Sequence, residues 1–119
     1  MKKILTTCFS LAVLLAAQGV HACDYPASVA APDGATASKE EMIAGQRAVK
    51  DYMARMEEYL ACIEAEEAAA VLQAGELDED AKRRRNEIFN GKYNGAVEEM
   101  NRVAEEFNIQ VRAFKDRSK

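Results

Sequence analysis

Apolar residues recur at helical spacing through the middle of the chain. Five of them stand seven residues apart and four more run beside them: Met42, Val49, Met56, Ile63 and Ala70, then Tyr52, Met53, Tyr59 and Leu60. A stripe of this kind buries one face of a long amphipathic helix. Ser38 and Glu41 form a capping box before the stripe, and Gly75 suits the position just after a helix end. The pattern predicts a helix over residues 38–74.

A second stripe follows a short interruption. Its apolar members are Phe89, Tyr93, Val97, Met100, Val103, Ala104, Phe107, Val111 and Phe114. Asp78 is a suitable N-cap, so we expect a second helix over about 78–115. The two seven-residue lines meet in antiparallel layers: Met42 with Phe114, Val49 with Phe107, Met56 with Met100, and Ile63 with Tyr93. The predicted fold class is all-α, a long antiparallel two-helix hairpin over residues 38–119.

Two Asn-Gly pairs interrupt the second stripe. They occupy positions 90–91 and 94–95, and Asn-Gly is normally a turn signal. A break at residues 90–95 would give three helices instead of two. The apolar line passes through Tyr93 without losing phase, which favours a continuous helix.

The first 22 residues have the pattern of a secretory signal peptide. Lys2 and Lys3 precede an apolar run over residues 4–17, and Val20-His21-Ala22 has aliphatic or small residues where signal peptidase needs them. A transmembrane anchor would need about 20 apolar residues, which this run does not supply. We predict a signal peptide over 1–22, cleaved after Ala22. The protein is then periplasmic or extracellular.

Removal of residues 1–22 changes the chemistry that the chain offers. It leaves 97 of the 119 residues and moves the formal net charge from -4 to -6, because Lys2 and Lys3 are lost. His21, the only histidine, is lost as well, and with it the usual base of a Ser-His-Asp or Cys-His arrangement. Two remaining cysteines are too few for a zinc site, and the acidic balance disfavours nucleic acid. We expect no enzyme, no catalytic residue, no cofactor, no metal and no nucleic-acid partner.

Residues 23–37 contain both prolines, Pro26 and Pro32, and are expected to be extended. This segment is long enough to run back along the first helix, so that Cys23 reaches Cys62. A disulfide between them is expected in an oxidising compartment. We also expect Gly91 and Gly95 to let the segment pack closely, and Tyr25, Val29 and Pro32 to cover the groove between the helices.

A rival interpretation of Cys23 is lipidation. Val20-His21-Ala22-Cys23 resembles a lipobox, although His21 stands where a small or hydroxyl residue is usual. The protein would then be a lipid-anchored envelope protein, and the membrane is expected as a partner only if Cys23 is lipidated. That alternative leaves Cys62 unpaired.

Near the tip of the hairpin, basic and acidic clusters could either bind a ligand or form ion pairs on the helix surface. Residues 82–85 form the one basic run, which would suit anionic lipid or nucleic acid but more simply forms ion pairs on a solvated helix face. We expect Glu79 to pair with Arg83, and Asp80 with Arg84. The acidic residues nearby lack the spacing of an EF-hand calcium site.

Several short segments resemble a group of small secreted proteins of Gram-negative bacteria. They are Cys23-Asp24-Tyr25-Pro26, Pro32-Asp33-Gly34, Tyr59-Leu60-Ala61-Cys62, Tyr93-Asn94 and Phe107-Asn108. The resemblance implies a helical hairpin and an exported protein, and it brings no catalytic residues. In outline the shape is also similar to periplasmic chaperones with helical hairpins, without an LTxxQ-type motif.

These observations favour an exported, non-catalytic binding or structural protein of the bacterial envelope, similar in role to a chaperone or adaptor. The alternatives are a lipid-anchored envelope protein and a small proteinaceous inhibitor of a hydrolase. A two-helix hairpin buries little surface for its length, so we expect a protein partner or self-association. A homodimer forming a four-helix bundle is one such possibility. Ile88 and Ile109 lie off the main stripe and are candidates either for packing under residues 23–37 or for contacts with a partner.

Overall fold

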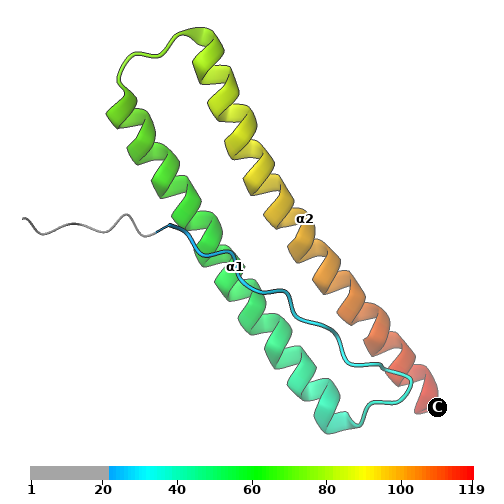
Figure 1. Cartoon of the computed structure of the whole chain (residues 1–119). Coiled ribbons are helices and arrows are strands. Elements are labelled where there is room, and N and C mark those ends of the chain that lie inside the picture. Colours follow the sequence, from blue (N-terminus) through cyan, green and yellow to red (C-terminus); the bar gives the residue numbers. More distant parts are fainter. Residues whose placement is uncertain (1–21) are drawn as a thin grey trace, which may run out of the picture.

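The computed structural model describes residues 22–119, in which two long helices run antiparallel (Figure 1). Helix α1 comprises Lys39–Ala74 and helix α2 comprises Glu79–Arg117. The expected all-α hairpin is therefore confirmed. Within the described range, neither helix combines the length and the apolar character needed to cross a membrane. The signal peptide predicted for residues 1–22 lies outside the described residues, apart from Ala22.

The helix ends form where the capping residues predict them. The Ser38 hydroxyl accepts a hydrogen bond from the Glu41 amide, and the Ser38 amide donates to the Glu41 carboxylate at 2.6 Å. This is a complete capping box, and it lowers the pKa of Glu41 through the hydrogen bonds from Ser38. Asp78 caps α2 by accepting from the Ala81 amide at 2.7 Å. Gly75, with φ of 66°, ends α1 in a backbone region that favours glycine.

Helix α2 is continuous through both Asn-Gly pairs. The favoured continuous helix is confirmed, and the alternative break at residues 90–95 does not occur; the helix extends to Arg117, two residues beyond the expected end. Ser118 supports this longer end, because its amide donates to the carbonyls of Phe114 and Lys115. Packing along the whole helix therefore outweighs the local cost of two interior glycines, about 1 kcal/mol each.

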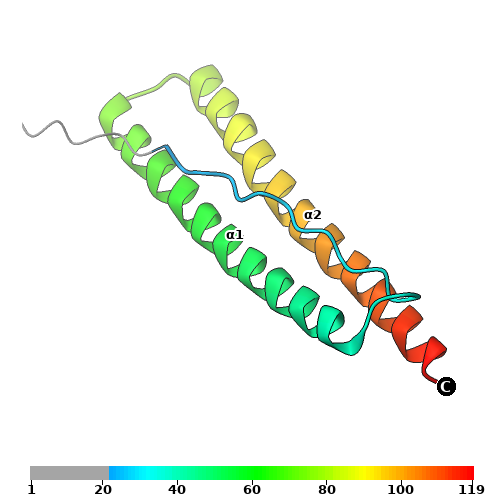
Figure 2. The same ribbon diagram turned by 60° about the horizontal axis from the view of Figure 1, so that its bottom comes forward.

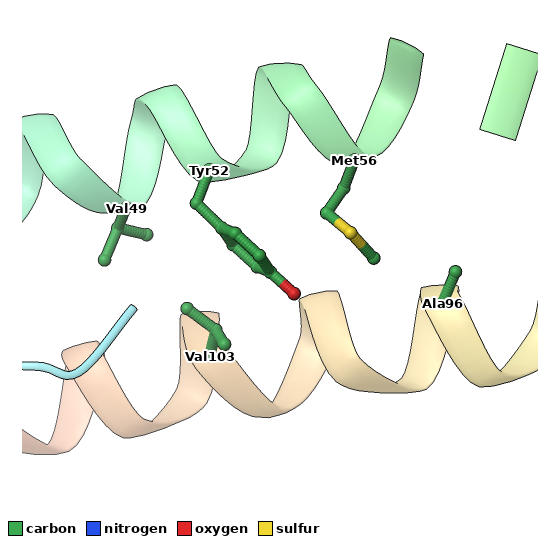
Figure 3. Packing of buried hydrophobic residues seen from close by; sticks show 5 residues of the cluster. All are labelled: Val49, Tyr52, Met56, Ala96 and Val103. Carbon is green, nitrogen blue, oxygen red and sulfur yellow. The ribbon is translucent and has the colours of Figure 1, made fainter. Parts of the chain in front are cut away.

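The core is a single seam between the helices. Val49, Tyr52 and Met56 of α1 pack against Ala96 and Val103 of α2, and all five are buried (Figure 3). The seam of α1 is the one that its heptad line predicts. The seam of α2 is predicted only in part: Val103 belongs to the expected stripe and Ala96 does not, while the expected line of Tyr93, Met100, Phe107 and Phe114 is only half-buried. Ala96 and Val103 have shorter side chains than the residues of the expected line.

Residues 23–37, called the strap below, run lengthwise against the helix pair. Figures 1 and 2 show this extended segment passing from α1 toward the C-terminal end of α2. A turn at Asp33 reverses the chain into α1, with its carbonyl accepting from the amides of Thr36 and Ala37. Arg117 then donates to the carbonyls of Ala35 and Ala37, at 3.0 and 2.6 Å. The last turn of α2 thus holds the end of the strap.

The glycines that permit close packing differ from the expected ones. Gly91 and Gly95 have open space where a side chain would begin, so the expectation that they admit the strap is wrong. The close approaches occur at Gly34 and Gly45 instead. A Cβ on Gly34 would overlap the backbone oxygen of Gln110, and one on Gly45 would lie 2.6 Å from the Pro32 ring. The strap therefore crosses the groove nearer the open end of the hairpin than Gly91 and Gly95.

These glycines give a matched pair of substitutions. Gly34→Ala should lower the free energy of unfolding by roughly 1–3 kcal/mol, because the Gln110 backbone cannot easily yield. Gly91→Ala adds the same methyl group at an interior position of α2, where it would point into open space. This change should raise the free energy of unfolding by about 1 kcal/mol. Denaturant unfolding of both variants measures the difference. Equal changes in both would contradict the placement of the strap.

Candidate functional site

A disulfide joins the strap to α1. Cys23 and Cys62 are bonded, with their Cα atoms 5.8 Å apart. Beside the bond, the Tyr25 ring meets the Tyr59 ring edge-on, with centroids 4.9 Å apart. Lipidation of Cys23 would require the same sulfur atom, so an anchored form and the bridged form exclude each other.

The carboxylate of Glu66 lies close to both disulfide sulfurs. Among the described residues, Cys23, Cys62 and Glu66 have ligand atoms within 4.8 Å of one another. Metal binding by cysteine requires thiolates, and both sulfurs are consumed by the bridge. With the disulfide formed, the two sulfurs of this cluster attach the strap to α1 and do not act as metal ligands.

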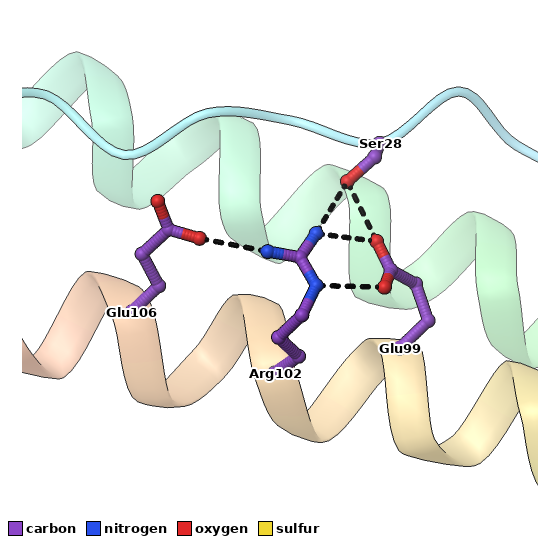
Figure 4. A network of polar contacts seen from close by, with 4 residues as sticks. All are labelled: Ser28, Glu99, Arg102 and Glu106. Carbon is purple, nitrogen blue, oxygen red and sulfur yellow. Dashed lines mark hydrogen bonds and ion pairs between the residues drawn. The ribbon is translucent and has the colours of Figure 1, made fainter.

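A four-residue polar network holds the middle of the strap on α2 (Figure 4). The Ser28 hydroxyl donates to Glu99 at 2.9 Å. Arg102 donates to both oxygens of Glu99, at 2.8 and 2.6 Å, and to Glu106 at 2.9 Å. The hydrogen bonds from Arg102, and then from Ser28, lower the pKa of Glu99 to about 2. The network is an attachment point rather than a reactive pair, since Arg102 and Ser28 engage both oxygens of Glu99.

Tyr52 lies under this network and is fully buried. Its side chain points from α1 toward α2 (Figure 3), and among the described residues its hydroxyl has no hydrogen-bond partner. Burial raises the pKa of Tyr52, and the nearby Tyr25 and Glu99 raise it further. The phenol therefore remains protonated at neutral pH and acts as a core side chain.

The face of the hairpin away from the strap is apolar and uncovered. One line of half-buried residues on α2 recurs at intervals of three and four: Tyr93, Val97, Met100, Ala104, Phe107, Val111 and Phe114. The α2 residues that bind the strap, including Glu99, Gln110 and Arg117, form a separate line about 100° around the helix. The strap thus covers one side of the seam and leaves the other side open.

Helix α1 contributes the opposite wall of this uncovered surface. Met53 and Leu60 are half-buried beside the seam, and Ile43 is 39% exposed. Near the open end, side chains of both helices line one hollow that no strap residue enters. Its apolar members are Met42, Ile43, Phe107, Val111 and Phe114, and Gln46, Lys39 and Lys115 line it as well. We call the α2 line together with Ile43, Met53 and Leu60 the open face. Its chemistry suits the burial of apolar surface against another protein.

The basic run at the tip is largely neutralised by ion pairs. Lys82 pairs with Glu79 and Arg83 with Asp80, three residues apart rather than the expected four. Arg85 forms two hydrogen bonds to Glu67 across the hairpin, at 3.1 and 3.0 Å. The solvated-face interpretation of this run therefore accounts for the geometry. Beyond it, Leu72 is 84% exposed and Ile88 64%, so the tip also carries isolated apolar side chains.

Some features of the site escaped the sequence analysis. Glu99, Arg102 and Glu106 have helical pair spacing, which could have predicted their ion pairs. Nothing in the sequence indicates that Ser28 meets them from the strap. Apart from Ile43, the open face consists of residues assigned to the core, and only the position of the strap reveals which of them remain uncovered. Ile109 lies outside the open face and is 46% exposed.

No protein-family model, curated protein or solved structure gives a significant match to this chain.

The Glu99 network makes a prediction about pH. In a carbon-detected NMR titration, the Glu99 carboxyl should titrate at about 2 instead of its ordinary 4.5. Because the folded value is the lower one, the ionised group stabilises the fold above pH 4.5, and this contribution disappears as the pH falls toward 2. Arg102→Gln should raise the pKa of Glu99 markedly, and Ser28→Ala less. An unchanged pKa in Arg102→Gln would refute the network.

The disulfide makes a prediction about stability. It joins residues 39 apart in sequence, so the paired substitution Cys23→Ser with Cys62→Ser should lower the free energy of unfolding by about 4 kcal/mol. Circular dichroism should still show helices, because the N-caps at Ser38 and Asp78 and the seam remain. Mass spectrometry of the mature protein without reductant provides the control. Two free thiols there would show that the bridge does not form.

Proposed function

We propose that this protein is an exported, non-catalytic binding or structural protein of the bacterial envelope, and that its open face docks another polypeptide. The observation that carries the proposal is that the strap covers only one of the two sides of the seam. A covalently attached strap covers one side, while a continuous apolar line follows the other side along most of α2. A chaperone or adaptor is the concrete form of this role.

Export is supported by the disulfide and by the N-terminal pattern. Structural disulfides persist in oxidising compartments such as the periplasm and the extracellular medium. The bridge occupies the Cys23 sulfur, which supports a periplasmic protein over the lipid-anchored alternative. The resemblance to small secreted proteins of Gram-negative bacteria points to the same compartment.

Docking is supported by the character of the open face. Soluble proteins rarely leave long contiguous apolar surfaces uncovered, and those that do use them for association. Aromatic residues and methionine, which are enriched at interfaces, supply much of this line: Tyr93, Met100, Phe107 and Phe114. Methionine also adapts to partners of different shape. A hydrolase inhibitor would use the same surface and would differ only in the identity of the bound protein.

Photocrosslinking in intact cells tests this role. A photoreactive amino acid at Val97, on the open face, should yield a discrete adduct with another polypeptide. The same amino acid at Glu98, the exposed neighbour on the solvent side, should yield little or none. Cell fractionation of the adduct should place it in the periplasm.

The control at Glu98 also defines failure. Equal adducts at the two positions would indicate nonspecific contact, and no adduct at Val97 would refute docking through the open face. An adduct whose second member is a hydrolase, with loss of that enzyme's activity, would establish the inhibitor alternative instead.

A further inference from the structure

We propose that the open face binds a second copy of this chain, antiparallel, about a two-fold axis that passes Met53 of α1 and Ala104 of α2. The inference rests on the proposed function, because it names the partner of the same face. The axis lies in the interface and perpendicular to the helices, so that each helix packs on its own counterpart. The dimer is then a four-helix bundle with one strap on each outer surface.

The apolar line of α2 has the symmetry that such an axis requires. A two-fold axis brings residues on one side of it against residues on the other side, so the face must match its own reverse. Residues at equal distances from Ala104, to within one position, are of the same kind: Met100 and Phe107, Val97 and Val111, Tyr93 and Phe114. Ala104 itself is small, which suits the closest approach of two helices.

The open-face side of α1 is self-complementary in charge about Met53. Lys50 and Glu57, both exposed, stand three residues before and four residues after it. When α1 packs antiparallel on its counterpart, each Lys50 lies beside the partner's Glu57. In a parallel dimer, the two-fold axis would run along the helices, and α1 would pack on α2 of the partner. The pairing of Lys50 with the partner's Glu57 would then be lost.

The two centres of symmetry lie at the same level of the hairpin. Tyr52 and Val103 pack together in the seam (Figure 3), and Met53 and Ala104 are the residues that directly follow them. One axis can therefore pass both centres. The symmetry of α2 comes from its apolar residues, and the symmetry of α1 comes from its charged residues. The two centres, Ala104 and Met53, are therefore independent of each other, and yet they lie at the same level of the hairpin.

The area of the face is sufficient for a stable dimer. With the axis at Met53, residues 39–67 of α1 lie opposite their counterparts over about 43 Å, and two helices side by side present about 800 Å² over that length. A standard interface buries about 800 Å² per partner. The rim of the face on α2 carries asparagines, Asn94, Asn101 and Asn108, all exposed and uncharged. Depletion of charge is typical of the interior of protein interfaces. The strap cannot serve as the occupant, because the disulfide holds it on the opposite side.

Cysteine crosslinking of the purified protein tests the axis directly. Ala104→Cys should form a covalent dimer under mild oxidation at least ten times faster than Ala54→Cys. Ala54 is at nearly the same level but lies on the solvent side of α1. Val97→Cys should link to Val111→Cys in a mixture of the two variants and not to itself. Rapid linking through Ala54→Cys, or of Val97→Cys to itself, would overturn the antiparallel arrangement.

Sedimentation of the purified wild-type chain tests the dimer itself. Lys50→Glu should raise the dimer dissociation constant about five-fold, because the axis repeats the Lys50–Glu57 pair twice. The charge exchange Lys50→Glu with Glu57→Lys should restore it. A monomer at all concentrations, together with an adduct at Val97 in cells, would overturn the second copy and leave the proposed function intact. A monomer without that adduct would overturn both.

Discussion

The structure depends on one geometric constraint: two helices in contact share a single seam, and a seam is open along both of its sides. The pair α1 and α2 can fully bury only residues that point directly at each other, such as Tyr52 and Met56. Everything beside them remains half in water unless a third element covers it. The strap is that element on one side. It is extended and belongs to no sheet, so its position depends on its attachments at the disulfide, at Glu99 and at Arg117.

The attachments of the strap are chemically different at each point. A covalent bond holds its start, a charged network holds its middle, and backbone carbonyls accept from a guanidinium at its end. An extended segment without sheet partners leaves its own amides and carbonyls unpaired, and so it gains little from regular hydrogen bonding. Side-chain contacts at intervals supply the enthalpy instead. The glycines at positions 34 and 45 bring the segment close enough for these contacts.

The hairpin could be predicted from the sequence because its signals are local and periodic. Ser38 with Glu41, Asp78 and Gly75 act within one helical turn, and the apolar spacing needs no tertiary information. The disulfide was predictable because only two mature cysteines remain. The α2 seam was predictable only in part, since Ala96 and Met100 are both compatible with a buried helix face, and the choice between them depends on helix separation. The contact of Ser28 with Glu99 spans 71 residues and has no local signal.

The hydrogen bonds from Arg117 to the strap have a consequence for folding during synthesis. The acceptor carbonyls at Ala35 and Ala37 precede Arg117 by 82 and 80 residues, so nearly the whole chain must be present before these hydrogen bonds can form. Ribosomes deliver the chain from its N-terminal end, and the strap is therefore made long before the helix that secures it. The end of the strap can therefore be secured only after the last turn of α2 has been synthesised, whereas its start can already be bonded to α1 through Cys62.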